Sequence, residues 1–167
     1  LMALYRLAED VGALKTARQY TDMTQALIIA GFGQEAQRVM QKGVDASLFA
    51  GDEAARATRT LDAAKRKADA ERAALPKAAG ALAAAKTSDE MEKVGELYFS
   101  AGDYVNASAA LQKAIAKGGL SDADSAQMLL GIALKRKGDK ANATKAFDLV
   151  KEPQFAEIAK LWKIAAR

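Results

Sequence analysis

The chain has 167 residues and a formal net charge of +4, with hydrophobic residues at 50% of positions and aromatic residues at only 6%. It contains no Cys and no His, which excludes disulfide bonds and thiolate zinc sites and removes the commonest general base. Alanine supplies much of the hydrophobic content, and no sustained alternation typical of strands is present. Because alanine suits closely packed helices, the composition predicts an all-α fold.

The N-terminal residues Leu1 to Arg6 begin directly with an amphipathic helical pattern. They lack the features of a cleaved signal peptide, so we expect the chain to be a fragment of a longer protein. No apolar run reaches the length of a membrane span, and no span is expected. Periodic apolar segments and their flanking caps predict helices over residues 1–11, 17–30, 34–46, 53–86 (with a break inside it), 88–100, 104–117, 122–136, 140–150 and 154–166.

A glycine turn between two helices recurs at Gly31, Gly102 and Gly138, and in each copy an Ala follows five residues later. The first two turns are 71 residues apart and the last two are 36 residues apart, so the first gap is close to two periods of the second. Such self-similarity at a fixed period is typical of helical repeat proteins.

A helix, a glycine turn and a helix repeating at about 35 residues resemble the tetratricopeptide (TPR) repeat. The matching residues are Gly95, Tyr98, Gly102, Tyr104 and Ala107 in one repeat and Leu130, Gly131, Leu134, Gly138, Ala143 and Phe147 in the next. The resemblance implies a single right-handed α-solenoid of helical hairpins over residues 1–167. Its expected parts are degenerate hairpins (1–51), a long helical segment (52–86), two repeats (87–121 and 122–153) and a capping helix (154–167).

The segment from Asp52 to Lys86 replaces the glycine turn that the repeat would place near residue 66. Pro76 removes one backbone hydrogen bond, so we expect a kink there or a second helix that starts at this residue. An apolar seam at nearly heptad spacing predicts packing along the solenoid. A coiled coil that recruits a second chain is the alternative. The seam comprises Ala54, Ala57, Leu61, Ala64, Ala68, Leu75 and Leu82.

The C-terminal segment carries apolar residues at helical spacing, with Glu157, Lys160 and Lys163 between them. One polar face and one apolar face are what a terminal capping helix needs. Trp162 is therefore expected in the core rather than in a ligand-stacking site.

The order of segments also resembles the C-terminal part of a group of longer, often exported proteobacterial TPR proteins. The residues that carry this resemblance are Leu4-Tyr5-Arg6-Leu7, Gly12 to Ala17, Ala30-Gly31-Phe32, Ala114 to Leu120 and Leu161-Trp162. It implies a periplasmic or secreted location and supplies no biochemical role.

Motifs for catalysis and nucleotide binding are absent from the sequence, including the P-loop, the zinc-protease motif and the nucleophile elbow. Glu92 and Glu96 share one helix face and can in principle serve acid–base chemistry or bind a cation, although such a pair is usually surface. We therefore expect no enzyme, no cofactor and no metal.

A basic run, Lys65-Arg66-Lys67, makes residues 56–77 the most positive part of the chain. A nucleic-acid or anionic-surface interface needs a continuous basic face, ideally with aromatic platforms. Acidic residues interleave here, and no aromatic residue lies between Phe49 and Tyr98. A solvated helix face is the expectation, and nucleic acid is the less favoured partner.

The TPR resemblance implies a concave groove lined by the first helix of each hairpin, where a peptide or partner helix binds. We therefore expect a non-catalytic protein-interaction module. A structural role is the alternative, with self-association through the exposed N-terminal end or the seam at 54–82. Glu92 and Glu96 replace the Lys and Asn of carboxylate-gripping TPR proteins, which favours an apolar and basic peptide. The expected groove residues are Arg18, Gln25, Ile28, Glu92, Glu96, Phe99, Met128, Ile132, Lys135 and Arg136.

Overall fold

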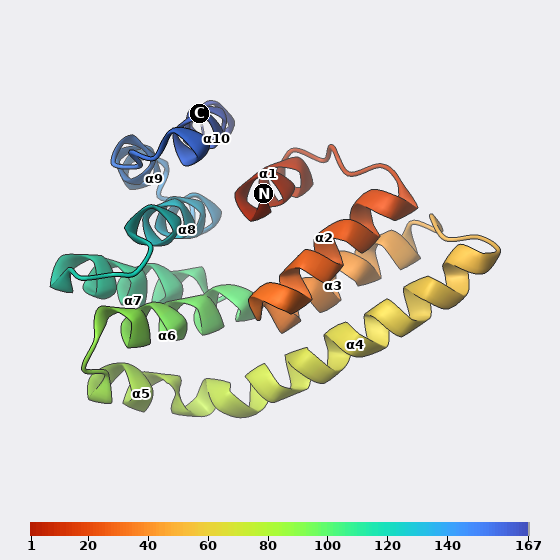
Figure 1. Cartoon of the computed structure of the whole chain (residues 1–167), viewed down its shortest axis with the longest axis horizontal. Helices are drawn as coiled ribbons and strands as arrows, with labels where there is room; N and C mark the ends of the chain where they lie inside the picture. The colour runs from red at the N-terminus through yellow and green to blue at the C-terminus, as the bar shows by residue number, and fades with distance from the viewer. Residues whose placement is uncertain (167) are drawn as a thin grey trace. The chain divides into compact units, whose positions relative to one another are not determined.

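The computed structural model describes residues 1–166, and these form helices joined by turns and short loops, without a strand (Figure 1). The all-α prediction is confirmed. The chain divides into an N-terminal unit, Leu1–Pro76, and a C-terminal unit, Lys77–Arg167. The helices are α1 (Met2–Asp10), α2 (Ala17–Ala30), α3 (Gly33–Asp45), α4 (Asp52–Ala74), α5 (Ala78–Ala84), α6 (Ser88–Ala101), α7 (Tyr104–Lys117), α8 (Ala123–Arg136), α9 (Lys140–Asp148) and α10 (Pro153–Ala165).

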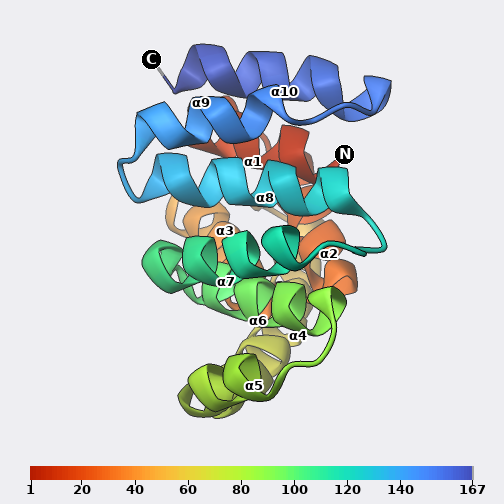
Figure 2. The same ribbon diagram turned by 90° about the vertical axis from the view of Figure 1, so that its left-hand side faces the viewer.

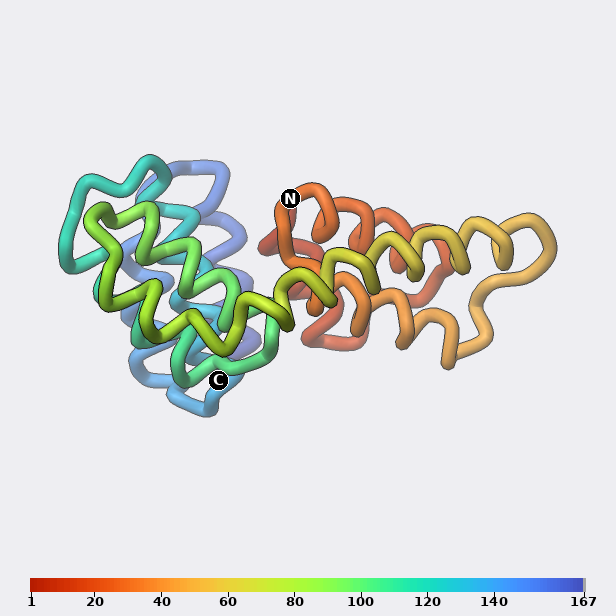
Figure 3. Tube along the Cα trace, turned by 90° about the horizontal axis from the view of Figure 1, so that it is seen from below, coloured from red at the N-terminus to blue at the C-terminus, as the bar shows by residue number. Residues whose placement is uncertain are grey.

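In the N-terminal unit, α2, α3 and α4 lie side by side (Figures 1 and 3). Gly33 sits so close to α4 that an added Cβ would lie 2.6 Å from the carbonyl carbon of Lys67. Glu71 of α4 caps α3, since its carboxylate accepts hydrogen bonds from the backbone N–H groups of Gly33 (2.6 Å) and Gln34 (2.8 Å). The buried apolar side chains of the three helices are Ala17, Met23, Leu27, Ala36, Val39, Met40, Ala57, Leu61, Ala64 and Ala68.

Much of the apolar seam expected along residues 54–82 packs against other helices of the same chain. Ala57 and Leu61 form a cluster with Met40 of α3, and Phe49 packs against it. Ala64 and Ala68 are fully buried as well. These side chains therefore offer no surface to a second chain, which corrects the suggestion that the seam mediates self-association. Three members lie outside the buried row, namely Ala54, which is exposed, and Leu75 and Leu82, which are half-buried.

The long helical segment is interrupted at Pro76. A 3₁₀ turn, Leu75–Lys77, separates α4 from α5, and the course of the chain through this turn can be followed in Figure 3. Because proline has no N–H to donate, it cannot complete a regular α-helical ladder at this point. The predicted break is thus present, and it coincides with the boundary between the two units.

Helix α1 is attached to α3 by ion pairs. The Arg6 guanidinium donates to both carboxylate oxygens of Glu35, with Nε–Oε1 at 3.0 Å and Nη2–Oε2 at 2.7 Å. Both side chains are at least 95% buried, and the guanidinium lies over the Phe32 ring at 4.3 Å. A second pair joins Lys42 to Glu9 at the surface. A buried, bidentate pair of this kind fixes the direction of α1.

The C-terminal unit contains two hairpins of the same design, α6–α7 and α8–α9, followed by α10 (Figure 2). In the first hairpin, Gly102 adopts a left-handed conformation and Asp103 caps α7 by accepting from the Asn106 N–H. In the second hairpin, Gly138, Asp139 and Asn142 repeat this arrangement. The repetition at 36 residues is therefore structural as well as sequential.

Carboxylates join each hairpin to the next helix. Asp89, near the start of α6, accepts from the backbone N–H (2.9 Å) and hydroxyl (2.6 Å) of Ser121, just before α8. Asp124, near the start of α8, accepts in the same way from the N–H groups of Lys151 and Glu152, just before α10. α10 thus occupies the place of the next hairpin's first helix.

Trp162 of α10 is fully buried and stacks on Phe147 of α9 with ring centroids 6.0 Å apart. The prediction that this residue belongs to the core is confirmed. Leu161 and Ile164 lie on the other side of α10 and are exposed. The helix therefore has one face in the core and one face in solvent, as its periodicity predicts.

Candidate partner-binding groove

One side of α2 turns away from the core of the N-terminal unit. The helix begins with a capping box in which Thr16 and Gln19 satisfy each other's backbone N–H groups. Met23 and Leu27 face the core, so residues at three- and four-residue steps from Arg18 share another face. This face consists of Arg18, Thr21, Asp22, Gln25, Ile28 and Ile29.

Two adjoining hollows lie between this face and α4, and both include Arg56. The first, of about 450 Å³, has an apolar character and is lined by Gln25, Ile28, Ile29, Arg56, Arg59, Thr60 and Ala63. The second, of about 300 Å³, is more polar and is lined by Arg18, Thr21, Asp22, Glu53 and Arg56. We call the two together the α2–α4 groove.

Ile29 is the most exposed large apolar residue of the groove, at 86% of its full accessible area, while Ile28 is half-buried. Removing a side chain of this size from water stabilises a contact by roughly 1.5–3 kcal/mol. The hydroxyl of Thr60 is already occupied, because it donates to the carbonyl of Arg56 at 3.0 Å. The apolar end therefore presents aliphatic surface rather than free hydroxyl groups.

The charged residues of the groove differ in whether they are compensated. Arg18 pairs with Asp22 one turn later, at 3.5 Å. Within residues 1–166, the Arg56 and Arg59 side chains make no ion pair or hydrogen bond. Both are exposed and project from the same face of α4, three residues apart. The groove thus combines aliphatic surface with two uncompensated guanidinium groups.

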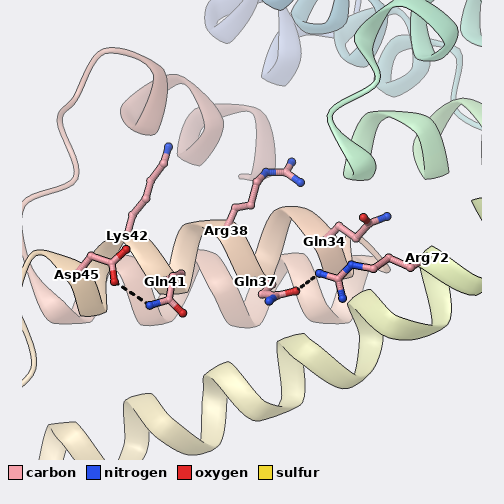
Figure 4. A pocket seen from close by; sticks show the side chains of 7 residues that line it. All are labelled: Gln34, Gln37, Arg38, Gln41, Lys42, Asp45 and Arg72. Atoms are coloured by element: carbon pink, nitrogen blue, oxygen red, sulfur yellow. Dashed lines mark hydrogen bonds between the residues drawn. The ribbon is translucent and has the colours of Figure 1, made fainter.

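A third hollow, of about 380 Å³, follows α3 and is drawn in Figure 4. Its cations have partners: Arg72 bonds to Gln37 and Asp69, and Lys42 bonds to Glu9. Gln41 donates to Asp45 at 2.8 Å. The Gln34 Nε2 is buried without a hydrogen-bond partner among the described residues. Most polar groups that line this third hollow have hydrogen-bond or ion-pair partners within the chain. The hollow therefore offers less to a ligand than the α2–α4 groove does.

Of the ten predicted groove residues, Arg18, Gln25 and Ile28 lie in the α2–α4 groove. The other seven belong to the C-terminal unit, and three of them are corrected. Phe99 and Ile132 are fully buried and Met128 is 2% exposed. Large apolar side chains of this kind are found both in partner interfaces and in protein cores. The sequence alone does not distinguish these two locations, whereas the packing does.

The predicted cations of α8 are engaged by aromatic rings. The Arg136 guanidinium lies 5.4 Å from the Phe99 ring centroid and 5.5 Å from that of Tyr104, and it donates to the Tyr104 hydroxyl at 3.1 Å. Lys135 lies over Trp162 at 5.6 Å. Such contacts hold both side chains against their own unit. Their geometry therefore favours a structural role within the C-terminal unit over contact with a partner.

Glu92 and Glu96 are half-buried on α6. Burial, and to a smaller extent the negative charges of Glu96, Asp89 and Asp122, together raise the pKa of Glu92 to about 7. Within the described residues, no group of three or more acidic, His or Cys side chains is arranged to hold a metal ion. Glu92 is thus a partly buried carboxyl group whose charged form is disfavoured by its surroundings.

Comparisons of the chain with protein-family models, with curated proteins and with solved structures find no match. No helix among residues 1–166 combines the length and apolar character required to cross a membrane.

Arg56 and Arg59 line the α2–α4 groove but are not among the predicted groove residues. The sequence predicts a solvated helix face for the basic segment 56–77, with a nucleic-acid or anionic-surface interface as the less favoured alternative. The positions 56, 59, 60 and 63 do follow helical spacing, which places them together on α4. Nothing in the sequence, however, indicates that this face meets Ile28 and Ile29 of α2.

Proposed function

We propose that the chain is a non-catalytic protein-interaction module built from TPR-type hairpins, and that the α2–α4 groove is its binding surface. The hairpins α6–α7 and α8–α9 support the repeat assignment, because their turns, caps and small-against-large contacts recur 36 residues apart. The hairpin α2–α3 supports it as well, since its capping box at Thr16 recurs 71 residues later at Thr87.

The observation that carries the proposal is the exposure of Ile29 beside two uncompensated arginines. A β-branched aliphatic side chain left 86% exposed gains free energy when a partner covers it. Helical repeat proteins commonly use the face lined by neighbouring helices to hold a segment of another protein. α4 lines this groove together with α2 rather than filling it.

Site-specific crosslinking tests the proposal. A photoreactive benzoylphenylalanine at position 29 should yield a discrete adduct, whereas the same group at Val105, a 65% exposed position on α7, should not. The adduct is identified by mass spectrometry, and the partner is then purified and titrated against the full chain. Ile29→Asp should weaken that binding by about tenfold or more while the helix content stays unchanged.

Three results would go against the proposal. Equal crosslinking from positions 29 and 105 would indicate non-specific contact. Binding of the purified partner that is unaffected by Ile29→Asp would place the interaction elsewhere on the chain. An adduct of two copies of this chain would favour self-association, the structural alternative.

A further inference from the structure

The charge of the α2–α4 groove indicates what kind of segment it takes. We propose that the groove binds an acidic segment of a partner protein, and that this segment also carries large apolar side chains. The inference rests on the proposed function of the same groove and adds the chemical class of the ligand.

The two ends of the groove differ in charge. At the apolar end, the charged lining residues are Arg56 and Arg59, and no acidic residue lines it. At the polar end, Arg18 is matched by Asp22 and the carboxylate of Glu53 also lines the hollow. The uncompensated positive charge therefore lies beside Ile28 and Ile29. A complementary ligand carries its carboxylates next to its apolar residues.

Two of the four other cations of α4, Lys65 and Arg72, are compensated by acidic neighbours on the same helix. Arg66 and Lys67 have no such partner among residues 1–166, but they line neither hollow. Lys65 lies 3.9 Å from Asp62, and Arg72 lies 2.6 Å from Asp69, each at a spacing of three residues. Arg56 and Arg59 lack such a partner within the described chain. A guanidinium accepts a carboxylate in a bidentate geometry, which adds direction to the charge attraction.

The apolar surface argues for a protein ligand rather than a nucleic acid. Single-stranded nucleic acids are held by aromatic side chains on which the bases stack, and no aromatic residue lines either hollow. Aliphatic side chains such as Ile28 and Ile29 instead bury leucine, isoleucine or phenylalanine side chains. The distance along α2 from Arg18 to Ile29 is about 16 Å, which corresponds to about three turns of a helical ligand.

The test uses the full chain and synthetic fluorescent peptides of about four helical turns. The first peptide has leucine along one face and glutamate or aspartate elsewhere. In the second peptide, lysine replaces each acidic residue. The third is acidic but has alanine in place of leucine. A single-stranded oligonucleotide serves as the nucleic-acid probe. Binding is followed by fluorescence anisotropy at low and at physiological salt.

We expect the acidic leucine peptide to bind at least about tenfold more tightly than the other three probes. The double variant Arg56→Glu/Arg59→Glu should lose this binding and gain affinity for the lysine peptide, which a merely damaged fold would not do. Lys65→Glu, on the same helix but outside the groove, is the matched control and should bind as the original chain does.

The two proposals fail in different ways. If position 29 crosslinks to a partner whose binding Arg56→Glu/Arg59→Glu leaves unchanged, the groove function stands and the acidic-ligand inference is wrong. If the oligonucleotide binds most tightly and the double variant abolishes it, the groove face is a nucleic-acid surface and the inference is overturned. If neither crosslinking nor peptide binding involves the groove, both proposals are wrong.

Discussion

Gly131 of α8 lies directly against Phe147 of α9, so that a Cβ added to the glycine would be 2.4 Å from Cε1 of the ring. The same relationship joins Gly95 to Leu111 in the preceding hairpin, where the added Cβ would be 2.8 Å from Cγ. Each pair is separated by 16 residues, and the two pairs are 36 residues apart. A small residue on one helix thus admits a large residue from the other, and this contact sets how closely each hairpin closes.

Gly131→Ala should destabilise the C-terminal unit by about 1–3 kcal/mol, because the Phe147 ring is buried and has little freedom to move aside. Urea unfolding followed by circular dichroism measures the change. Gly80→Ala is the matched control and should be neutral or slightly stabilising, since a Cβ added there has no atom of residues 1–166 within 4 Å apart from its chain neighbours and its own helix backbone. Equal effects of the two variants would contradict the packing argument.

Loss of one member of the Arg6–Glu35 pair should cost about 3–5 kcal/mol, because the remaining charge stays buried without its partner. Arg6→Met and Glu35→Gln are the single variants. The double variant should be less destabilised than the sum of the two, since it leaves no isolated charge. Urea unfolding gives the free energies, and hydrogen exchange over α1–α3 shows where the change occurs. Strict additivity would mean that the two side chains do not depend on each other.

The stability of the C-terminal unit should fall as pH rises toward and above 7, and Glu92 should contribute to this fall. Its pKa of about 7 in the folded chain exceeds the usual value of 4.5, chiefly through burial and then through the charges of Glu96, Asp89 and Asp122. The folded state therefore binds the proton more tightly than the unfolded state does. Its contribution is present below about pH 4.5 and is lost as pH rises through 7.

Glu92→Gln removes this titration. The variant should have a higher urea midpoint than the original chain at pH 8 and a nearly equal midpoint at pH 4, measured at constant ionic strength. Glu157→Gln is the control for net charge, since it removes one acidic charge, together with a surface ion pair to Lys160, from an exposed position on α10. A gain for Glu92→Gln that is the same at both pH values would rule out titration as its cause.

Asp124→Ala should loosen α10, because the carboxylate accepts from the N–H groups of Lys151 and Glu152 at the entrance to that helix. We expect the free energy of unfolding to fall by about 1 kcal/mol, as it does when a helix cap is removed. Trp162 is the single tryptophan of the chain and is fully buried, so its fluorescence reports on the packing of α10 against α8 and α9. We expect a red shift and greater quenching by iodide. Asp103→Ala, which removes the cap of α7, should leave the fluorescence unchanged.

The helices and their ends could be predicted from the sequence because the signals are local. Capping boxes at Thr16 and Thr87, and glycines at Gly31 and Gly102, act within a few residues of the helix ends that they define. Most predicted ends agree with the structure to within two residues. Trp162 was also assigned correctly to the core, since its neighbours at helical spacing are apolar.

The faces that are buried, and those that remain for a partner, were decided only by tertiary packing. Phe99, Met128 and Ile132 fit a groove and a core equally well in sequence, and packing placed them in the core. In the sequence, Arg56 and Arg59 look like ordinary surface charges. Only the packing of α4 beside α2 brings them next to Ile28 and Ile29. A helix end is fixed by hydrogen bonds within one turn. Burial and charge compensation depend instead on which residues, distant in the chain, come to lie next to each other.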